Sequence, residues 1–276
     1  MARAKLIRRI EASALMSPLL SLAATLARSA GVHARSGRAV GMQVVDTKLT
    51  DTDMVTKFDR ECEAMIIGSL RRERPDDTIV GEEGGARDSK SGYTWVIDPI
   101  DGTSNFVRGV PVWATLIALV HDVDGPVLGV VSAPSLGRRW WGAVGVGAYV
   151  DGRPICVSDT SELSEAQVSV TFNSGWDAAG KTAELVRLQQ SAYRARGYGD
   201  FWQHMLVAEG AVDIAVDAIG LAPYDNAAVQ AVVEAAGGRH TDRFGNRDFT
   251  QDSAISTSAT AAAASRRNFR PVSITT

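Results

Sequence analysis

Four carboxylates in this sequence stand at the ends of predicted elements, where side chains from distant segments can meet. Glu82, Asp98 and Asp101 lie where predicted strands end in loops, and Asp225 opens a predicted helix. Asp98 and Asp101 are separated by a Pro-Ile pair, and proline fixes one φ and removes one N–H. Such a rigid turn can aim both carboxylates and the Ile100 carbonyl at one point.

Carboxylates gathered in this way have a chemistry of their own. Hard divalent cations prefer oxygen ligands, and Mg²⁺ favours carboxylates together with water and a substrate phosphate. Without a cation the charges would repel one another and take up protons. The cluster therefore suggests a metal site. Ordinary turn and helix-cap aspartates are the alternative, and on composition alone they are the more common case.

Small residues follow this turn directly. Gly102, Thr103, Ser104 and Asn105 come after a predicted strand and start a predicted helix. Their backbone N–H groups would be exposed there, and the helix dipole favours an anion at the same place. Metal ligands beside a phosphate-binding turn form a more specific signal than either feature alone.

The composition is that of a globular protein with a sizeable core: 276 residues, 45% apolar and 22% charged. The formal charge of -3, from 29 basic and 32 acidic residues, does not indicate a nucleic-acid binder. Two cysteines exclude a disulfide framework and a cysteine-based zinc site. Nucleic acid is therefore not an expected partner.

The apolar segments do not favour a membrane protein. The longest uncharged apolar run, 111–120, is about half a bilayer span, so no transmembrane helix is expected. Arg8 and Arg9 precede an apolar stretch that faintly imitates a secretion signal, but Glu11 and Pro18 interrupt it. We expect instead a loose basic lead-in through residue 9, an amphipathic first helix and a cytoplasmic location.

Two patterns of predicted elements divide the chain. A helix begins at a capping box formed by Thr56 and Asp59, and short β-rich runs separated by turn residues then favour an antiparallel meander. Later in the chain strands and helices alternate, which is typical of an α/β arrangement. We expect residues 1–152 to form an α+β half with the metal and catalytic loops. Residues 153–276 would form an α/β half with the substrate-selecting residues.

Several segments resemble the inositol monophosphatase family of Mg²⁺-dependent phosphomonoesterases. The resemblance covers roughly residues 45–257 and includes Asp-Pro-Ile-Asp-Gly-Thr-Ser-Asn-Phe, a long and specific string. The other segments occur in the family's order. They are Asp53–Asp59, Gly81–Glu83, Tyr224–Ala228 and Glu234–Gly238. The resemblance implies an α+β or α/β fold of the layered αβαβα sandwich type and a metal-dependent phosphatase. A relative that only binds phosphometabolites is less favoured, because every implied ligand is present.

Within this family the chain is similar to the histidinol-phosphate phosphatases. The similar segments are 106–119, 129–134 with 138–141, 198–201, and 221–225, where Tyr224 replaces the more usual tryptophan. This branch hydrolyses L-histidinol phosphate to L-histidinol and phosphate in histidine biosynthesis. Hydrolysis of inositol 1-phosphate or another small sugar monophosphate is the alternative, and a homodimer is expected because relatives commonly form one.

The resemblance also implies a role for each matching residue. Asp53 and Thr103 would form a dyad that orients and deprotonates the attacking water. Two to three Mg²⁺ ions would be held by Glu82, Asp98, the Ile100 carbonyl, Asp101 and Asp225, and the substrate phosphate by Gly102, Thr103 and Ser104.

Substrate choice would lie in the second half of the chain. Asp217 occupies the position of a hydroxyl-binding glutamate in inositol-cleaving relatives, and a carboxylate there can pair with a substrate ammonium. Asp200 has the same potential, although it also suits a helix N-cap. Four aromatic side chains offer a stacking wall for an imidazole, but core or rim positions are more common for such residues. They are Trp140, Trp141, Trp202 and His204.

Overall fold

The computed structural model describes residues 2–39, 44–47, 54–84 and 91–258. A seven-stranded sheet takes up much of the first half. Its strands are neighbours in chain order, β3 pairs with β4 in parallel, and every other pair is antiparallel. The predicted meander is confirmed, with one parallel strand at its edge. The strands are β3 (Thr78–Gly81), β4 (Tyr93–Asp101), β5 (Ala114–His121), β6 (Gly125–Ala133), β7 (Arg138–Ala143), β8 (Gly147–Val150) and β9 (Arg153–Ile155).

A second, five-stranded sheet has the order β11-β10-β12-β14-β13. Strand β10 pairs in parallel with both β11 and β12, and β14 runs antiparallel to β12 and β13. A two-stranded sheet of β1 and β2 and the 3₁₀ turn η1 lie outside these sheets. The bounds are β1 (Val44–Thr47), β2 (Met54–Thr56), η1 (Leu163–Glu165), β10 (Gln167–Val170), β11 (Arg194–Arg196), β12 (Ile214–Val216), β13 (Arg239–Thr241) and β14 (Ile255–Thr257).

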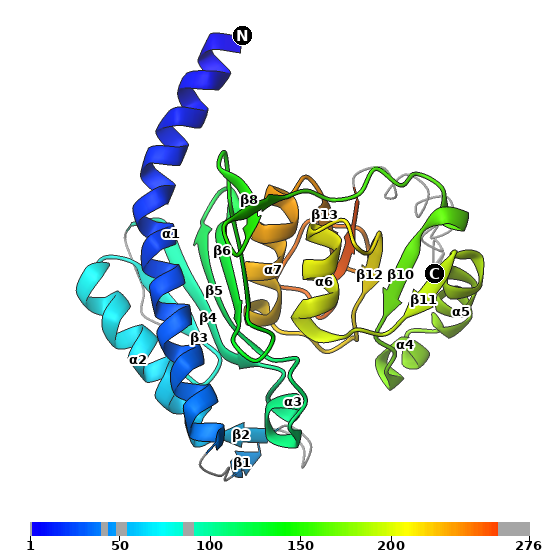
Figure 1. Ribbon diagram of the computed structural model, residues 1–276, viewed down its shortest axis with the longest axis horizontal. Coiled ribbons are helices and arrows are strands. Elements are labelled where there is room, and N and C mark those ends of the chain that lie inside the picture. The colour runs from blue at the N-terminus through cyan, green and yellow to red at the C-terminus, as the bar shows by residue number, and fades with distance from the viewer. Residues whose placement is uncertain (1, 40–43, 48–53, 85–90, 259–276) are drawn as a thin grey trace, which may run out of the picture.

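The helices form three layers around the two sheets (Figure 1). Helices α1 and α2 cover one face of the seven-stranded sheet, α6 and α7 fill the space between the sheets, and α4 and α5 lie on the outer side of the five-stranded sheet. This arrangement confirms the predicted αβαβα sandwich. The bounds are α1 (Ala2–Ala39), α2 (Lys57–Glu73), α3 (Thr103–Arg108), α4 (Ser174–Ala178), α5 (Thr182–Ser191), α6 (Asp200–Ala208) and α7 (Pro223–Ala235).

Both faces of the seven-stranded sheet are buried, and side chains alternate between them. Trp95 and Ile97 belong to the apolar cluster beneath α1 and α2, whereas Val96 belongs to the cluster that packs against α6 and α7. A strand covered on both faces needs a nearly continuous apolar sequence. Strand β5, Ala-Thr-Leu-Ile-Ala-Leu-Val-His, meets this requirement.

The N-terminal helix differs from the prediction at its start. Helix α1 begins at Ala2, where a loose lead-in through residue 9 was predicted. Residues 2–9 hold strong helix formers such as Ala, Arg, Lys and Leu and no glycine or proline, so the helix extends through them. Within the described part of the chain, no helix is long and apolar enough to cross a membrane.

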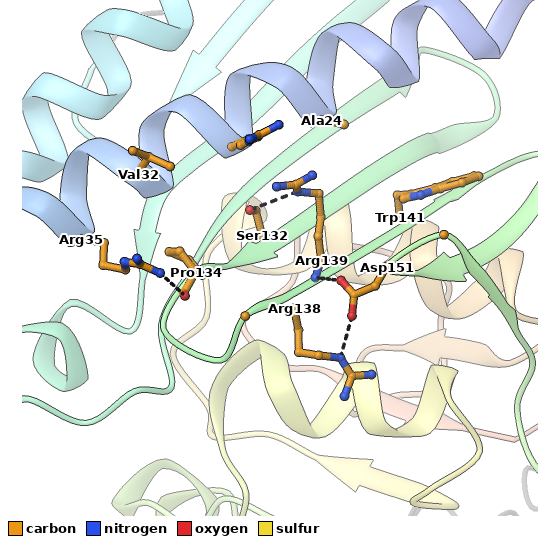
Figure 2. Close-up of a pocket in the computed structure, with 12 residues that line it drawn as sticks. Ala24, Val32, Arg35, Ser132, Pro134, Arg138, Arg139, Trp141 and Asp151 are labelled. Carbon is orange, nitrogen blue, oxygen red and sulfur yellow. Dashed lines mark hydrogen bonds and ion pairs between the residues drawn. The ribbon is translucent and has the colours of Figure 1, made fainter.

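A cavity of about 370 Å³ lies between α1 and the hairpin of β6 and β7. Figure 2 shows Arg139 extending toward Ser132, while Asp151 accepts a hydrogen bond of 2.9 Å from the Arg139 backbone N–H and pairs with Arg138 at 3.1 Å. Arg28 and Arg35 of α1 also line this cavity. None of the four carboxylates singled out in the sequence lies in its wall, so the cavity is separate from their site.

Helix α7 packs unusually close to the sheet, and two glycines permit this approach. A Cβ atom at Gly129 would lie 2.3 Å from the carbonyl oxygen of Ala228, and one at Gly142 would lie 2.9 Å from the Cα of Val232. Such distances leave no room for any side chain. The approach matters for function because α7 carries Asp225 near its N-terminus.

The Gly129→Ala variant is expected to lose about 1–3 kcal/mol of unfolding free energy, because the added methyl overpacks the contact with α7. Chemical denaturation monitored by circular dichroism measures this change. Gly68→Ala is the matched control, since a Cβ at Gly68 in α2 meets nothing closer than 3.9 Å. In a helix interior that change should be neutral or stabilise by up to about 1 kcal/mol. Equal stability of Gly129→Ala and wild type would contradict the close packing.

Candidate active site

An irregularity in β4 brings Asp98 and Asp101 to the same place. The strand runs on through Asp101, although a loop was predicted there, and its pairing with β5 shifts register between the two aspartates. In a regular strand, side chains an odd number of residues apart point to opposite faces. The bulge interrupts this alternation, so Asp98 and Asp101 can point to the same side. The Thr115 hydroxyl donates a hydrogen bond of 2.9 Å to the Pro99 carbonyl and so ties the irregular segment to β5.

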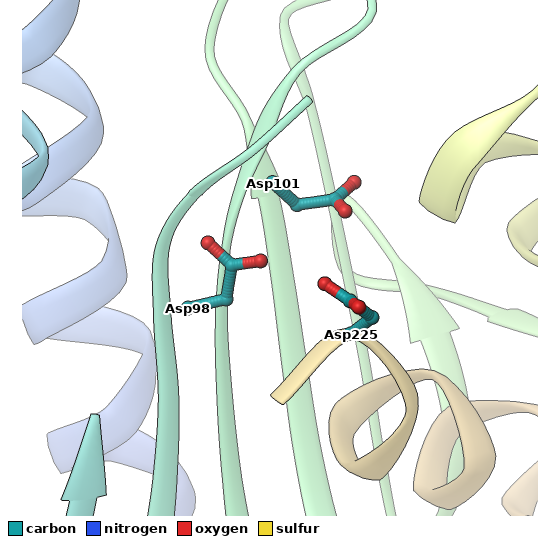
Figure 3. A group of neighbouring side chains, drawn as sticks. All are labelled: Asp98, Asp101 and Asp225. Atoms are coloured by element: carbon teal, nitrogen blue, oxygen red, sulfur yellow. The ribbon is translucent and has the colours of Figure 1, made fainter. Parts of the chain in front are cut away.

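Asp225 reaches the same point from helix α7. Pro223 opens the helix, a position where its missing N–H is not needed. The Ala222 N–H donates a hydrogen bond of 2.6 Å to Oδ2 of Asp225. Figure 3 shows the carboxylates of Asp98, Asp101 and Asp225 pointing toward one another, and oxygen atoms from all three lie within 4.8 Å of each other.

Without a bound cation, the acidic cluster is energetically unfavourable. Burial raises the pKa of Asp98 well above its usual range, and the charges of Glu82, Asp101 and Asp225 raise it further. Burial likewise raises the pKa of Asp101, and it raises the pKa of Asp225 to about 7. Oδ1 of Asp98 is buried and accepts no hydrogen bond from the described residues. A divalent cation would supply both the missing charge and the missing partner, so the donor set fits a metal.

Two further predicted ligands, Glu82 and Ile100, lie next to this cluster. Glu82 directly follows β3, and its N–H donates a hydrogen bond of 3.2 Å to the Ile97 carbonyl, one residue before Asp98. Its charge contributes to the raised pKa values of Asp98 and Asp225. The Ile100 carbonyl accepts a hydrogen bond of 2.9 Å from the Thr103 hydroxyl and retains a second lone pair.

Thr103 meets a carboxylate, although a different one from the residue named in the sequence analysis. Its hydroxyl lies 3.1 Å from Oδ1 of Asp59. The other oxygen of Asp59 accepts hydrogen bonds from the backbone N–H and the hydroxyl of Thr56, at 2.7 and 2.5 Å. Burial raises the pKa of Asp59. Asp53, the predicted partner of Thr103, lies outside the described residues.

The sequence analysis assigned Asp59 only to the capping box that starts α2. That box is confirmed, with Thr56 as the N-cap residue. The structure adds that a single side chain both caps α2 and contacts Thr103. A usable signal was present, because Asp59 ends the first segment that resembles the family. Because the capping box already explained an aspartate at this position, the contact of Asp59 with Thr103 was not predicted.

Asp200 lies beside the cluster at the start of α6. Its φ of 48° is in the left-handed region, which is uncommon for a residue other than glycine. Its Oδ2 accepts a hydrogen bond of 2.6 Å from the Asn105 side chain, and the next N–H, that of Phe201, donates to Asp101 at 3.3 Å. Burial and the charge of Asp217 raise the pKa of Asp200 to about 6. Asp200 is therefore not the N-cap of α6, because Gly199 holds that position and the helix begins at Asp200.

Asp217 follows β12 and is 5% exposed. Its charge contributes to the raised pKa values of Asp101, Asp200 and Asp225, which places it within electrostatic reach of the cluster. One carboxylate oxygen lies 3.0 Å from Nε2 of His204, and the other accepts the Ala218 N–H at 2.7 Å.

Most of the suggested aromatic wall has another role. Trp140 is fully buried and donates its indole N–H to Glu209 at 2.7 Å. Trp141 stacks on Tyr149, with ring centroids 4.1 Å apart. His204 is 2% exposed and contacts Asp217. Packing therefore accounts for Trp140 and Trp141, and the contact with Asp217 accounts for His204, so none of the three is assigned to a stacking wall.

Comparison with known proteins agrees with this geometry. Fold and site together define an αβαβα protein with an acidic cluster suited to a divalent cation. The sequence model of the inositol monophosphatase family matches residues 15–270. The chain belongs to the inositol monophosphatase family.

Individual relatives share much of the chain. It is 48% identical over 206 residues to the histidinol-phosphatase of Mycobacterium tuberculosis, covering 73% of this chain and 78% of that one. It is 38% identical to a fructose-1,6-bisphosphatase/inositol-1-monophosphatase of Thermotoga maritima, over 73% of this chain and 76% of the relative. Among solved structures, the suhB protein of Bartonella henselae superimposes with a TM-score of 0.84 at 26% identity, covering 93% of this chain and 100% of that chain.

Binding of Mg²⁺ to the metal-free protein should release protons below about pH 7, because the raised pKa values keep part of the cluster protonated there. The apparent Mg²⁺ affinity should therefore rise with pH between about 5.5 and 7.5, across the Asp225 pKa of about 7. Calorimetric titration in two buffers of different ionisation enthalpy measures the proton release. Asp225→Asn removes one titrating ligand and should reduce it. Binding that is independent of pH over this range would contradict the assignment.

Proposed function

We propose that this protein is a Mg²⁺-dependent phosphomonoesterase that hydrolyses L-histidinol phosphate to L-histidinol and phosphate. The observation that carries the proposal is that the site holds more acidic side chains than metal binding requires. Asp200 and Asp217 lie beside the proposed metal ligands, and neither is needed to hold a metal. The uncharged sugar of a sugar phosphate gains no charge pairing from these two carboxylates. A substrate that carries an ammonium group in addition to its phosphate does gain it. The names of the histidinol-phosphatases among the relatives support the same choice.

Two to three Mg²⁺ ions would be held by Glu82, Asp98, the Ile100 carbonyl, Asp101 and Asp225. When bound, they would supply Lewis-acid stabilisation of charge on the phosphoryl oxygens and would lower the pKa of bound water.

The Thr103 hydroxyl and the Asp59 carboxylate would orient the attacking water and receive its proton. A threonine hydroxyl alone is a poor base, so the neighbouring carboxylate is required. Asp59 is well placed for this, because Thr56 fixes one of its oxygens while the other faces Thr103. Burial raises the pKa of Asp59, which makes it a better proton acceptor than an exposed aspartate.

The start of α3 would bind the phosphate. Gly102 precedes the helix with a φ of 78°, and a Cβ there would lie 3.0 Å from the Val112 carbonyl oxygen. The turn therefore requires a glycine. The backbone N–H groups of Gly102, Thr103 and Ser104 would donate to the phosphoryl oxygens as charge develops on them.

Asp200 and Asp217 would pair with the substrate ammonium. Asp200 contacts Asn105, which follows the phosphate-binding turn, and its neighbour Phe201 contacts Asp101. An ammonium held here would lie close to a phosphate held at the metals. This reach suits a small amino alcohol phosphate.

Steady-state kinetics on a panel of monoesters tests the substrate. We expect kcat/KM for L-histidinol phosphate to exceed that for inositol 1-phosphate by about 10²-fold or more, since a paired buried charge contributes several kcal/mol to discrimination. The Asp101→Asn variant is the negative control and should release no phosphate above background. A preference for inositol 1-phosphate would support the alternative substrate, and no phosphate release from any monoester under Mg²⁺ would refute a phosphatase.

A second experiment decides which carboxylate serves Thr103. Asp59→Asn should lower kcat by about 10²–10⁴-fold, the usual contribution of a general base, with little change in KM. Thr103→Ala should match it, while Thr103→Ser keeps the hydroxyl and should retain most activity. Asp53→Asn is the comparison variant. A large loss in Asp53→Asn with near-normal Asp59→Asn would restore the dyad predicted from sequence.

A further inference from the structure

A chain of buried polar side chains runs from Asp217 into the interior of the second half. Nε2 of His204 lies 3.0 Å from Oδ2 of Asp217, and Nδ1 of His204 lies 2.8 Å from the Ser256 hydroxyl. The same hydroxyl lies 2.9 Å from Nδ1 of His240. Each of these four residues is at most 5% exposed. The phosphatase chemistry proposed above uses Asp217 and leaves the other three without a role.

Three separate elements build this chain. His204 comes from α6, whereas His240 and Ser256 are directly opposite each other on the antiparallel strands β13 and β14. Strand β14 also pairs with β12, the strand that ends just before Asp217. The hydrogen bonds therefore link α6 to three strands of the sheet, and the position of Asp217 depends on all of them.

The protons of the chain have one consistent arrangement when both imidazoles are neutral. Burial lowers the pKa of His240 well below its usual value, and the nearby His204 lowers it further. An ionised Asp217 can only accept, so His204 donates from Nε2 and accepts at Nδ1. Ser256 must then donate to His204 and accept from His240. Each of the three hydrogen bonds that link His240, Ser256, His204 and Asp217 is thus donated in the direction of Asp217.

We propose that His204, supported by Ser256 and His240, is a positioning residue that holds the Asp217 carboxylate in the orientation that binds the substrate ammonium. This inference rests on the proposed function. The imidazole donates to one oxygen, and the Ala218 N–H donates to the other. The carboxylate plane is thereby fixed, and its remaining lone pairs are set before substrate arrives.

A purely structural role would have a different consequence. If the chain of hydrogen bonds only stabilised the fold, its loss would lower the fraction of folded enzyme and so reduce the turnover of all phosphate esters equally. If it orients Asp217, the loss falls on substrates that carry an ammonium group. The dependence on substrate therefore separates the two roles.

The test compares His204→Leu and His204→Gln with wild type on L-histidinol phosphate and on inositol 1-phosphate, which lacks an ammonium group. His204→Leu should raise KM for histidinol phosphate by about tenfold or more, the size expected for losing a hydrogen bond to a charged group. Its KM for inositol 1-phosphate and its kcat on both esters should change less than about threefold. His204→Gln keeps a side-chain N–H donor and should recover part of the loss.

The matched control is His121→Leu. His121, the last residue of β5, also contacts an aspartate through a ring nitrogen, at 2.9 Å from Asp124 in the exposed turn before β6. This change should leave both KM values unaltered. Ser256→Ala provides a milder variant if His204→Leu does not fold, and it should shift KM in the same substrate-dependent direction by a smaller factor.

The outcomes are distinct. A wild type without preference for histidinol phosphate would refute the proposed function before any variant is compared. A wild type with that preference, whose folded His204 and Ser256 variants lose activity equally on both esters or lose none, would overturn only the role of His204.

Discussion

The repulsion among buried carboxylates is the constraint on which this structure depends. Asp98, Asp101 and Asp225 place carboxylate oxygens within 4.8 Å of one another, and the charge of Glu82 raises the pKa of Asp98 further. No isolated segment would adopt such an arrangement, because ionised groups at this distance repel strongly when they are removed from water. The remainder of the fold must supply the free energy that holds them together. The large apolar clusters on both faces of the seven-stranded sheet are the source of that free energy.

The layered architecture explains how residues from both halves reach one site. The middle helical layer, α6 and α7, packs between the two sheets, and the N-termini of both helices carry acidic residues of the site, Asp200 and Asp225. Strand β4 brings Asp98 and Asp101 from one sheet, and β12 leads to Asp217 from the other. Since the helices contact both sheets, a change in their packing would move the proposed metal ligands and the proposed substrate-selecting residues together.

The sequence predicted local features well and long-range contacts poorly. The capping box at Thr56 and the meander were recoverable, because each depends on residues near one another or on periodicity, whereas the αβαβα layers were predicted from the resemblance to the family. The contact between Asp59 and Thr103 joins residues 44 apart in the chain, and that of His204 with Ser256 spans 52 residues. No local pattern encodes such pairs. The bulge in β4 was not predicted for a related reason. Pro99 indicated an interruption of the strand, but not how the side chains on either side of it would be directed.

Hydrogen-bond accounting distinguishes the roles of the acidic residues. Asp59 accepts three hydrogen bonds from side chains and backbone, and Asp217 has a partner for each oxygen. Protein donors thus fix these two carboxylates in place, which suits groups that orient a water or an ammonium. Oδ1 of Asp98, in contrast, has no donor within the described structure, and Asp101 accepts only one long bond of 3.3 Å, from Phe201. Carboxylates that the protein leaves undersatisfied keep their lone pairs for a cation, so the same residue type serves two functions according to the donors around it.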